Sequence, residues 1–262
     1  KPTAIFMGPA HAAAYRNTDL LAKNDFSSVK YTVFSGAYSP PDVLKWWREQ
    51  TGSGLCQLWG MTELASGTFS RPGMDLEITV NSSGPASPGN EIRIVSPENG
   101  EVQPAGSEGE LQVRGSSVFP GYLYNPEANS DVFDKDGWFR TGDLAVISRD
   151  GNLSITGRTK DIINRGGVKY NPADIEEIIY THPKVVMTAI VPMKDPVLGE
   201  KACCFIQPIM GKKIDLEELT SFLAEKKISK HKWPERLELV DEMPLTPTRK
   251  VIKRKLEVLL EQ

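Results

Sequence analysis

The sequence predicts a multi-domain protein that combines α/β and α+β architecture, because the pattern of its elements changes twice along 262 residues. A strand–helix–strand order near the amino terminus is typical of a parallel α/β sheet. From Gly84 to Gly151, short strands separated by Asn-Gly and Asp-Gly turns indicate a small antiparallel, barrel-like region. Amphipathic helices mixed with short apolar strands follow, and this mixture predicts an α+β domain.

Residues 1–75 are expected to form the end of the parallel α/β subdomain. Residues 31–35 are β-branched and aromatic and precede Gly36, which favours a strand that ends in a turn. A helical pattern runs from Pro41 to Gln50, and residues 55–59 are expected to be the next parallel strand.

Residues 76–158 are expected to form the barrel-like subdomain and residues 159–262 a mobile C-terminal α+β domain, with a hinge near Lys160. Within the middle region, strands are expected at 91–95, 110–114 and 144–147. In the last region we expect helices at 174–180, 215–226 and 250–260 and strands at 185–191 and 202–206.

The composition is that of an ordinary globular protein, with 39% hydrophobic and 25% charged residues and a net charge of -3. This charge gives no reason to expect binding to nucleic acid, and no segment is long and apolar enough to span a membrane. Cys203 and Cys204 are adjacent in an apolar run, which predicts reduced thiols and a cytoplasmic protein. Because the first residue is Lys1, we expect the chain to be a piece of a longer protein.

The first segment that could bind a ligand or take part in catalysis runs from Trp59 to Glu63, at the end of a predicted strand. Open α/β sheets bind ligands at the carboxyl ends of their strands. There the hydroxyl of Thr62 could bind a phosphate oxygen, Glu63 could hold Mg2+, and Trp59 could stack on a purine. The alternative is a plain strand end with a polar turn.

Asp143 follows Gly142 in a segment where an acid could accept hydrogen bonds from ribose hydroxyls. In isolation, a Gly-Asp β-turn of no further function is the better interpretation. Residues 159–161 lie where the sequence pattern changes from the barrel-like region to the α+β domain. They are expected to form a hinge, and the alternative is a solvated linker.

A Thr/Pro loop at 244–249 precedes a basic cluster that includes Lys250. One lysine on such a loop could neutralise a carboxylate or phosphate in a transition state. A basic helix end is the plain alternative, and a nucleic-acid patch is disfavoured by the acidic balance of the chain.

Together and in this order, these segments resemble the adenylate-forming superfamily, which includes acyl-CoA synthetases and peptide-synthetase adenylation domains. Five motifs carry the resemblance over essentially the whole chain: Trp59-Gly60-Met61-Thr62-Glu63, Gly109-Glu110-Leu111 with Gly115 and Gly121-Tyr122, Arg140-Thr141-Gly142-Asp143, Gly157-Arg158-Thr159-Lys160-Asp161 with Gly166-Gly167, and Thr246-Pro247-Thr248-Arg249-Lys250.

The resemblance implies a role for each matching residue. Thr62 should touch the α-phosphate, Glu63 should bind Mg2+, and Lys250 should contact the carboxylate and the α-phosphate during adenylation. The other implied roles are nucleotide binding by Gly36, Ala37, Tyr38, Trp59, Gly60, Asp143 and Arg158, an acyl pocket bordered by Pro9, His11, Gly60 and Met61, a hinge at Lys160, and a coenzyme A path beside Gly166 and Gly167. For His11, an ordinary helix-start histidine is an equally good interpretation.

Three departures from the family pattern stand out. Arg249 replaces the glycine that usually precedes the closing lysine, and Tyr38 and Ser39 replace a common Pro-Leu pair. The family's phosphate-binding loop, which is expected upstream, has no counterpart in this sequence.

The resemblance therefore implies activation of a carboxylic acid by ATP and Mg2+ to an acyl-AMP, followed by transfer to coenzyme A. Two alternatives stay open: an aryl or amino-acid adenylation domain that loads a carrier protein, and an inactive module that only binds nucleotide. The sequence names neither the acid nor the oligomeric state.

Overall fold

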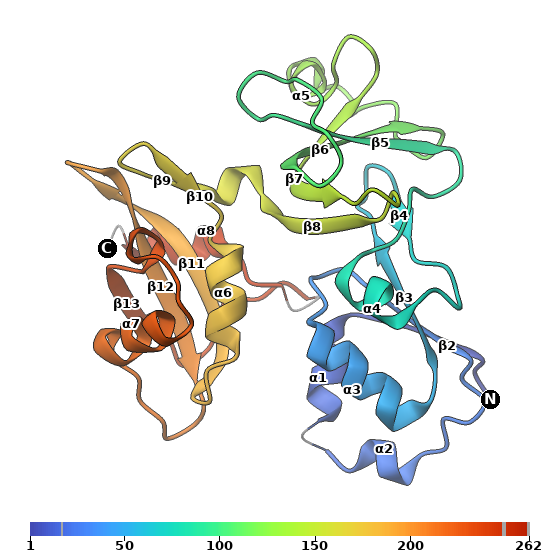
Figure 1. Ribbon diagram of the computed structural model, residues 1–262, viewed down its shortest axis with the longest axis horizontal. Coiled ribbons are helices and arrows are strands. Elements are labelled where there is room, and N and C mark those ends of the chain that lie inside the picture. Colours follow the sequence, from blue (N-terminus) through green and yellow to red (C-terminus); the bar gives the residue numbers. More distant parts are fainter. Residues whose placement is uncertain (17, 248–249, 261–262) are drawn as a thin grey trace. The chain divides into compact units, whose positions relative to one another are not determined.

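The computed structural model describes residues 1–16, 18–247 and 250–260, in two compact units, Lys1–Ile155 and Thr156–Gln262 (Figure 1). Each unit has its own sheets and its own buried clusters. The finer division into three domains with boundaries at 75 and 158 remains a prediction.

The first sheet of unit 1 is the predicted parallel sheet. Its strands lie in the order β1 (Ala4–Met7), β2 (Tyr31–Ser35), β3 (Gly54–Trp59) and β4 (Thr68–Phe69). β1, β2 and β3 run parallel, and the short β4 is antiparallel to β3. The helix α3 (Pro41–Thr51) is the crossover that the strand–helix–strand pattern predicts.

Helices cover this sheet around one tryptophan. Figure 1 shows α1 (Pro9–Tyr15) beside α3, and two further short helices, α2 (Leu20–Lys23) and α4 (Leu76–Asn81), complete the set. Trp47 of α3 is 1% exposed, and its indole N–H donates to Thr32 Oγ1 at 3.0 Å. Because a buried N–H without a partner is costly, this bond fixes how α3 lies on β2.

The second sheet of unit 1 is antiparallel and open rather than a closed barrel. Its order is β5 (Asn90–Val95), β6 (Glu108–Gly115), β7 (Phe139–Ile147) and β8 (Leu153–Arg158). The short helix α5 (Pro126–Val132) precedes β7 and is capped by the side chain of Asn125, which accepts from Ala128 N. The predicted strands are confirmed, but β7 begins five residues earlier than expected.

Unit 2 is an α+β fold around one five-stranded sheet. Its order is β10 (Val168–Tyr170), β9 (Ile163–Arg165), β12 (Gly199–Pro208) and β11 (Val185–Asp195), with β13 (Arg236–Leu239) parallel to β12. The helices are α6 (Ala173–Tyr180), α7 (Leu216–Glu225) and α8 (Lys253–Leu260), with the 3-10 turns η1 (Thr159–Asp161) and η2 (Lys230–Lys232).

Side chains alternate across β12, so both faces of this sheet are buried. Cys204 and Ile206 lie in a cluster with residues of α6 and α7, whereas Cys203 and Phe205 pack with Leu256 of α8. The adjacent cysteines therefore point to opposite faces and are free thiols, as expected. Burial raises the pKa of each to about 12.

The last predicted helix begins later than expected. α8 starts at Lys253 rather than at residue 250, because Val251 forms a β-bridge with Leu245 and Ile252 N donates to Pro244 O. Lys250 therefore lies in a loop and not on the helix.

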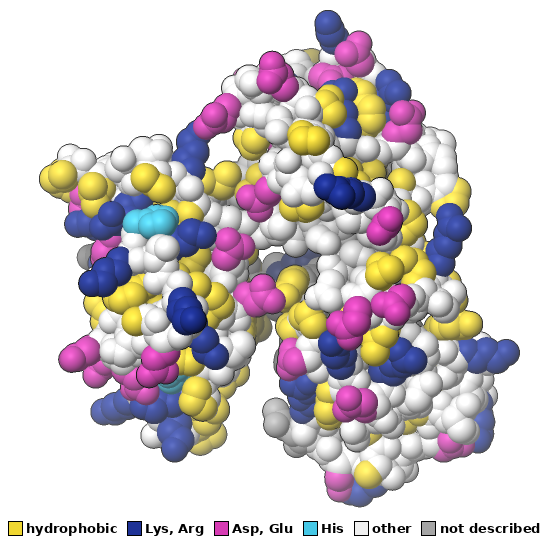
Figure 2. All heavy atoms as spheres, in the orientation of Figure 1, with side chains coloured by type: hydrophobic (Ala, Val, Ile, Leu, Met, Phe, Trp, Pro, Cys, Tyr) yellow, Lys and Arg dark blue, Asp and Glu magenta, His cyan; other side chains and the backbone are white. Residues whose placement is uncertain are grey.

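Among the described residues, no helix has the length and apolarity needed to cross a membrane. On the face that Figure 2 shows, basic and acidic side chains are interspersed.

Candidate functional site

Three predicted segments meet at one edge of the parallel sheet. Gly8, Gly36 and Gly60 directly follow β1, β2 and β3. The register pairs Met7 with Phe34 and Ser35 with Leu58, so the three segments leave the sheet at neighbouring positions. This carboxyl edge is where open α/β sheets bind ligands.

The segment after β1 turns at once into a helix. Pro9 opens α1, and His11 Nδ1 lies 3.3 Å from Gly8 O. A Cβ atom on Gly8 would lie 3.5 Å from this ring and 3.6 Å from Ser35 O, so His11 packs at the edge beside the end of β2. His11 is thus a helix-start histidine that also lies at the candidate site.

The segment after β2 depends on a glycine. Gly36 has a φ of +90°, a conformation that glycine adopts readily, and it lets the chain turn away from the sheet. Ala37 and Tyr38 follow at this edge, and Tyr38 is 56% exposed. Its ring is therefore accessible to a ligand.

The segment after β3 folds back on itself between Trp59 and Gly67. Gly67 N donates to Trp59 O at 3.0 Å and closes the loop at its base. A Cβ atom on Gly60 would lie 1.8 Å from Ala65 O, and one on Gly67 would lie 2.1 Å from the Trp59 ring. Only glycine fits at these positions, and the loop holds Met61 half-buried and Thr62 exposed.

Asp143 meets Trp59 across 84 positions of sequence. The indole N–H of Trp59 donates to Asp143 Oδ2 at 2.9 Å, and Asp143 is 5% exposed. This contact between two predicted nucleotide-binding residues carries no signal in the sequence, because it depends on how the two sheets of unit 1 pack.

The expected Gly-Asp turn is wrong, because residues 141–143 form a bulge inside β7. Arg140 pairs with Gln112 and Leu144 with Glu110, so three residues face Leu111 alone. Gly142 has a φ of +71° within this bulge. A bulge re-aims side chains relative to the regular pleat, and here it accompanies the contact of Asp143 with Trp59.

Glu63 is held by the segment that follows β6. Tyr122 Oη donates to Glu63 Oε1 at 2.9 Å, and Phe119 N donates to Glu63 O at 2.7 Å. Burial, and then the hydrogen bond and charge of Glu63, raise the pKa of Tyr122, so its phenol stays protonated at neutral pH. The sequence marked Tyr122 only as part of a motif and did not predict this contact.

The oxygen donors suit a hard cation that is shared with a ligand. Among the described residues, no group of three or more His, Cys, Asp or Glu side chains could hold a metal ion. Glu63 supplies a carboxylate in the loop after β3, and the carboxylate of Asp143 already accepts the Trp59 indole N–H. Mg2+ is commonly bound by one or two carboxylates together with substrate phosphates and water, so this chemistry fits Mg2+ brought in by a nucleotide.

The remaining predicted residues belong to unit 2 and lie in turns, except Arg158, which lies at the end of a strand. Arg158 ends β8 and Lys160 lies in η1, both exposed, while Gly166 and Gly167 form the turn between β9 and β10 with φ of +59° and +89°. Lys250 is also exposed.

The loop that carries Lys250 is closed at its base. Thr246 N donates to Lys250 O at 2.8 Å, and Lys250 N donates to Thr246 Oγ1 at 3.0 Å. These bonds fix the backbone and leave the ammonium at the surface. Arg249, the departure from the family pattern, lies outside the described residues.

Lys253 is a connecting residue that the sequence reasoning missed. Its Nζ lies 2.7 Å from Glu176 Oε1 of α6 and 3.6 Å from Asp161 Oδ2 of η1. The first residue of α8 therefore ties the base of the Lys250 loop to the predicted hinge.

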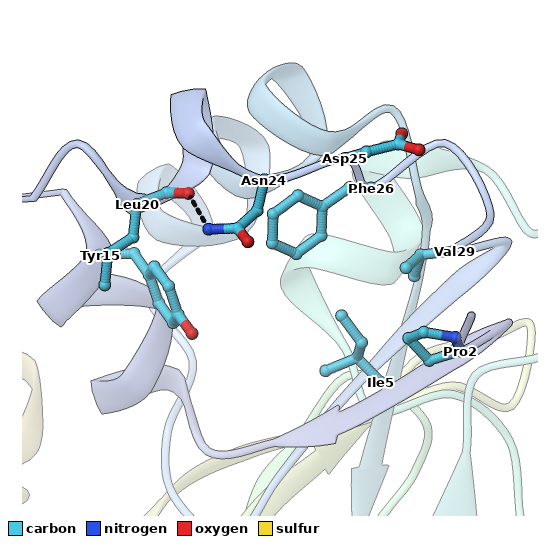
Figure 3. Close-up of a pocket in the computed structure, with 8 residues that line it drawn as sticks. All are labelled: Pro2, Ile5, Tyr15, Leu20, Asn24, Asp25, Phe26 and Val29. Atoms are coloured by element: carbon cyan, nitrogen blue, oxygen red, sulfur yellow. Dashed lines mark hydrogen bonds between the residues drawn. The ribbon is translucent and has the colours of Figure 1, made fainter.

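A separate cavity of about 370 Å³ lies on the α1–α2 side of β1 (Figure 3). It is lined by Ile5, Tyr15 and Phe26, and Asn24 Nδ2 donates to Leu20 O beside it. Pro2 and Val29 place it toward the amino ends of β1 and β2. It therefore lies away from the carboxyl edge and is not part of the candidate site.

Family models identify the class of protein. The model described as "AMP-binding enzyme" matches residues 1–123, and "AMP-binding enzyme C-terminal domain" matches residues 174–250. The chain belongs to this family of adenylate-forming enzymes, as the motifs predict.

Individual relatives are ligases and adenylating enzymes. The chain is 35% identical over 240 residues to "Medium-chain acyl-CoA ligase ACSF2, mitochondrial" of Danio rerio, covering 90% of this chain and 39% of that protein. It is 36% identical over 222 residues to "Salicylyl-CoA synthase / salicylate adenylyltransferase" of a Streptomyces species, a match that covers 84% of this chain and 40% of that protein. The chain thus spans about two fifths of the length of these relatives.

The fold is shared with solved structures of the same family. The crystal structure of ATP-bound MatB from Rhodopseudomonas palustris superposes with a TM-score of 0.92 at 28% identity, covering 100% of this chain and 52% of that one.

Proposed function

We propose that this chain is the C-terminal part of an acid–thiol ligase that activates a carboxylic acid with ATP and passes the acyl group to coenzyme A. The observation that carries the proposal is the carboxyl edge of the β1–β3 sheet, where Asp143 and Glu63 are each fixed by an aromatic side chain. The ATP in the MatB structure and the ligase names of the relatives support it.

In the first half-reaction, the carboxylate of the acid attacks the α-phosphate of ATP and releases pyrophosphate. Thr62 donates its hydroxyl to the α-phosphate, while Trp59, Gly60 and the segment from Gly36 to Tyr38 bind the adenine. Asp143 accepts hydrogen bonds from the ribose hydroxyls, and Arg158 donates hydrogen bonds to their oxygens. A Mg2+ ion held by Glu63 would neutralise phosphate charge when bound.

Lys250 provides a positive charge where two anions must approach each other. The attacking carboxylate and the α-phosphate repel, and a positioned ammonium lowers this repulsion most where the new bond forms. Pro9, His11, Gly60 and Met61 border the acid. Holding both reactants in one site supplies the remaining advantage.

In the second half-reaction, the thiol of coenzyme A attacks the acyl-AMP and displaces AMP. The turn at Gly166 and Gly167 borders the pantetheine, and a rotation about Lys160 exchanges Lys250 for this turn.

A second function follows from the name of one relative. Because that protein is described as a salicylate adenylyltransferase, an aryl acid that is loaded onto another acceptor is the competing reaction. A cytoplasmic location also remains a prediction, since the Danio rerio relative is named as mitochondrial.

Isotope exchange between pyrophosphate and ATP, measured on the full-length protein with a panel of aliphatic and aryl acids, tests the first half-reaction. Thioester formation with coenzyme A or with a phosphopantetheinylated carrier protein then distinguishes the acceptors. Absence of exchange with every acid would favour the inactive module.

The 262-residue chain alone is expected to give no more than a trace of this exchange, because the family's phosphate-binding loop is expected upstream. Robust exchange by the isolated chain would contradict that expectation.

A further inference from the structure

The carboxylate of Glu63 is oriented by a residue outside its own loop. Tyr122 donates to Oε1 at 2.9 Å, and Phe119 N donates to the Glu63 carbonyl at 2.7 Å. The backbone and the side chain of Glu63 are thus both held by the segment between β6 and α5. Among the described hydrogen bonds this is the one to its carboxylate, which leaves Oε2 for a further ligand.

Tyr122 is itself fixed by Asn129 of α5. Tyr122 N donates to Asn129 Oδ1 at 2.6 Å, and Asn129 Nδ2 donates back to Tyr122 O at 3.0 Å. The amide side chain of Asn129 therefore binds both backbone polar groups of Tyr122. A Cβ atom on Gly121 would lie 2.9 Å from Asn129 Oδ1, so the glycine permits this close approach.

The same segment is anchored in the core of the second sheet. The ring of Phe119 makes an edge contact with Tyr122, with centroids 4.8 Å apart, and another with Phe139 at 5.5 Å. Phe139 is 1% exposed. Tyr122 thus presents its hydroxyl from a packed base rather than from a free loop.

We propose that Tyr122, clamped by Asn129, is a positioning residue that sets the Glu63 carboxylate so that Oε2 meets the divalent cation accompanying ATP. This inference rests on the proposed function, because it takes Glu63 as the metal ligand. The hydrogen bond removes rotational freedom that the carboxylate would otherwise lose on binding the metal.

Protonation is compatible with this role. Because burial and the adjacent Glu63 raise the pKa of Tyr122, the phenol remains a donor throughout the neutral range. Loss of the donor in Tyr122→Phe keeps the ring and its packing but leaves Oε1 to water.

The test is equilibrium binding of ATP to the full-length protein, in EDTA and in Mn2+, with bound Mn2+ counted by electron paramagnetic resonance. No acid substrate is added, so no turnover occurs. In the unmodified protein Mn2+ should tighten ATP binding, and Glu63→Gln should remove most of that effect. Tyr122→Phe should reduce it about tenfold, with affinity in EDTA within about twofold of the unmodified protein.

Tyr124→Phe is the matched control, since Tyr124 lies two positions along the same segment and is 94% exposed. It should behave as the unmodified protein does. Asn129→Ala should follow Tyr122→Phe with a smaller loss, because the hydroxyl remains but is less well placed.

The outcomes separate this inference from the proposed function. If Glu63→Gln removes the Mn2+ effect and Tyr122→Phe does not, the positioning role is wrong while the metal site stands. If Glu63→Gln leaves the Mn2+ effect intact, the metal role of Glu63 fails and the inference fails with it. Equal losses in EDTA and in Mn2+ for Tyr122→Phe would show a purely structural role.

Discussion

The strand-edge site of unit 1 and the functional turns of unit 2 hold their residues in different ways. Trp59 holds Asp143, and Tyr122 holds Glu63, through side-chain hydrogen bonds that span 84 and 59 positions of sequence. Lys160 and Lys250 instead lie exposed in short turns. The backbone around Lys250 is closed locally by Thr246, and no long-range bond to either lysine side chain is found among the described contacts.

This difference suggests a division of labour in the proposed reaction. Residues fixed by distant partners are preorganised, which suits nucleotide binding. Exposed side chains on surface turns suit groups that enter the site in one half-reaction and move out of it in the other. Substitutions in unit 1 should therefore change binding and stability together, whereas those at exposed turns of unit 2 should change a rate alone.

Lys250→Ala should give the largest effect of any change in unit 2. We expect adenylation in the full-length protein to fall by about 10²–10³, since a positioned charge is lost where the carboxylate meets the phosphate. The thermal melt should not move, because Lys250 is exposed. Single-turnover kinetics of each half-reaction is the measurement, with exposed Lys255→Ala as control. Equal losses in adenylation and in thioester formation from supplied acyl-AMP would remove the assigned role.

Gly60→Ala should break the strand-edge site by a steric route. The new Cβ would lie 1.8 Å from Ala65 O, so the loop must move. We expect a loss of about 1–3 kcal/mol in the free energy of unfolding and at least a tenfold weaker affinity for ATP.

Gly8→Ala is the matched substitution at the neighbouring strand end, where the nearest atom lies at an ordinary 3.5 Å. It should change the free energy of unfolding by less than about 1 kcal/mol. Calorimetry of ATP binding and chemical denaturation measure the affinity for ATP and the free energy of unfolding of both variants. Similar behaviour of the two variants would mean that the loop after β3 is not tightly packed.

The same contrast explains what the sequence could predict. Element types followed from local patterns: 31–35 and 55–59 are strands, and α7 begins where Asp215 caps it. The candidate site residues of unit 1 are proposed from motifs and stay a prediction. The segment 141–143, taken in isolation, was expected to be a turn but is a bulge, because a Gly-Asp pair is favoured in both.

Contacts between distant segments left no trace in the sequence. Tyr122 with Glu63, and Lys253 with Glu176 and Asp161, depend on packing that local periodicity does not encode. The start of α8 was misplaced for a related reason. Basic residues at 250 and 253–255 suggested one continuous helix, but Val251 and Ile252 between them are β-branched, and Val251 forms a bridge with Leu245.

Lys253→Met should destabilise unit 2, because Lys253, unlike Lys160 and Lys250, has partners distant in sequence. Its side chain is 20% exposed and neutralises two carboxylates. Removing the ammonium of Lys253 leaves Glu176 and Asp161 without its positive charge, and we expect a loss of about 1 kcal/mol in the free energy of unfolding. Lys253→Arg should restore most of that loss, and exposed Arg254→Met should cost little. A melt of Lys253→Met that matches the unmodified chain would contradict the tie between α8 and the hinge.

The smallest effect expected is a pH dependence confined to unit 2. His182 is 6% exposed, and its Nδ1 accepts a hydrogen bond from Lys184 N at 3.2 Å. Burial lowers the pKa of His182, nearby Glu218 opposes this and Lys184 adds to it. A protonated Nδ1 would place a donor against a donor, so the fold favours neutral histidine.

The sign of the effect follows from proton counting. With its pKa lower in the folded than in the unfolded state, His182 binds fewer protons when folded, so stability falls as pH drops through about 6.5. We expect a loss below about 1 kcal/mol in the free energy of unfolding of unit 2 between pH 7.5 and 5.5.

Hydrogen exchange measures this loss separately in each unit. As the pH falls, β11 amides of unit 2 should lose protection, and β2 amides of unit 1 should not show the same dependence of protection on pH. His182→Asn keeps an acceptor near the position of Nδ1 but does not titrate, so it should flatten the β11 slope, whereas His231→Asn, at an exposed position in η2, should leave it unchanged. An equal slope in the unmodified chain and in His182→Asn would assign the pH dependence of unit 2 to its carboxylates instead.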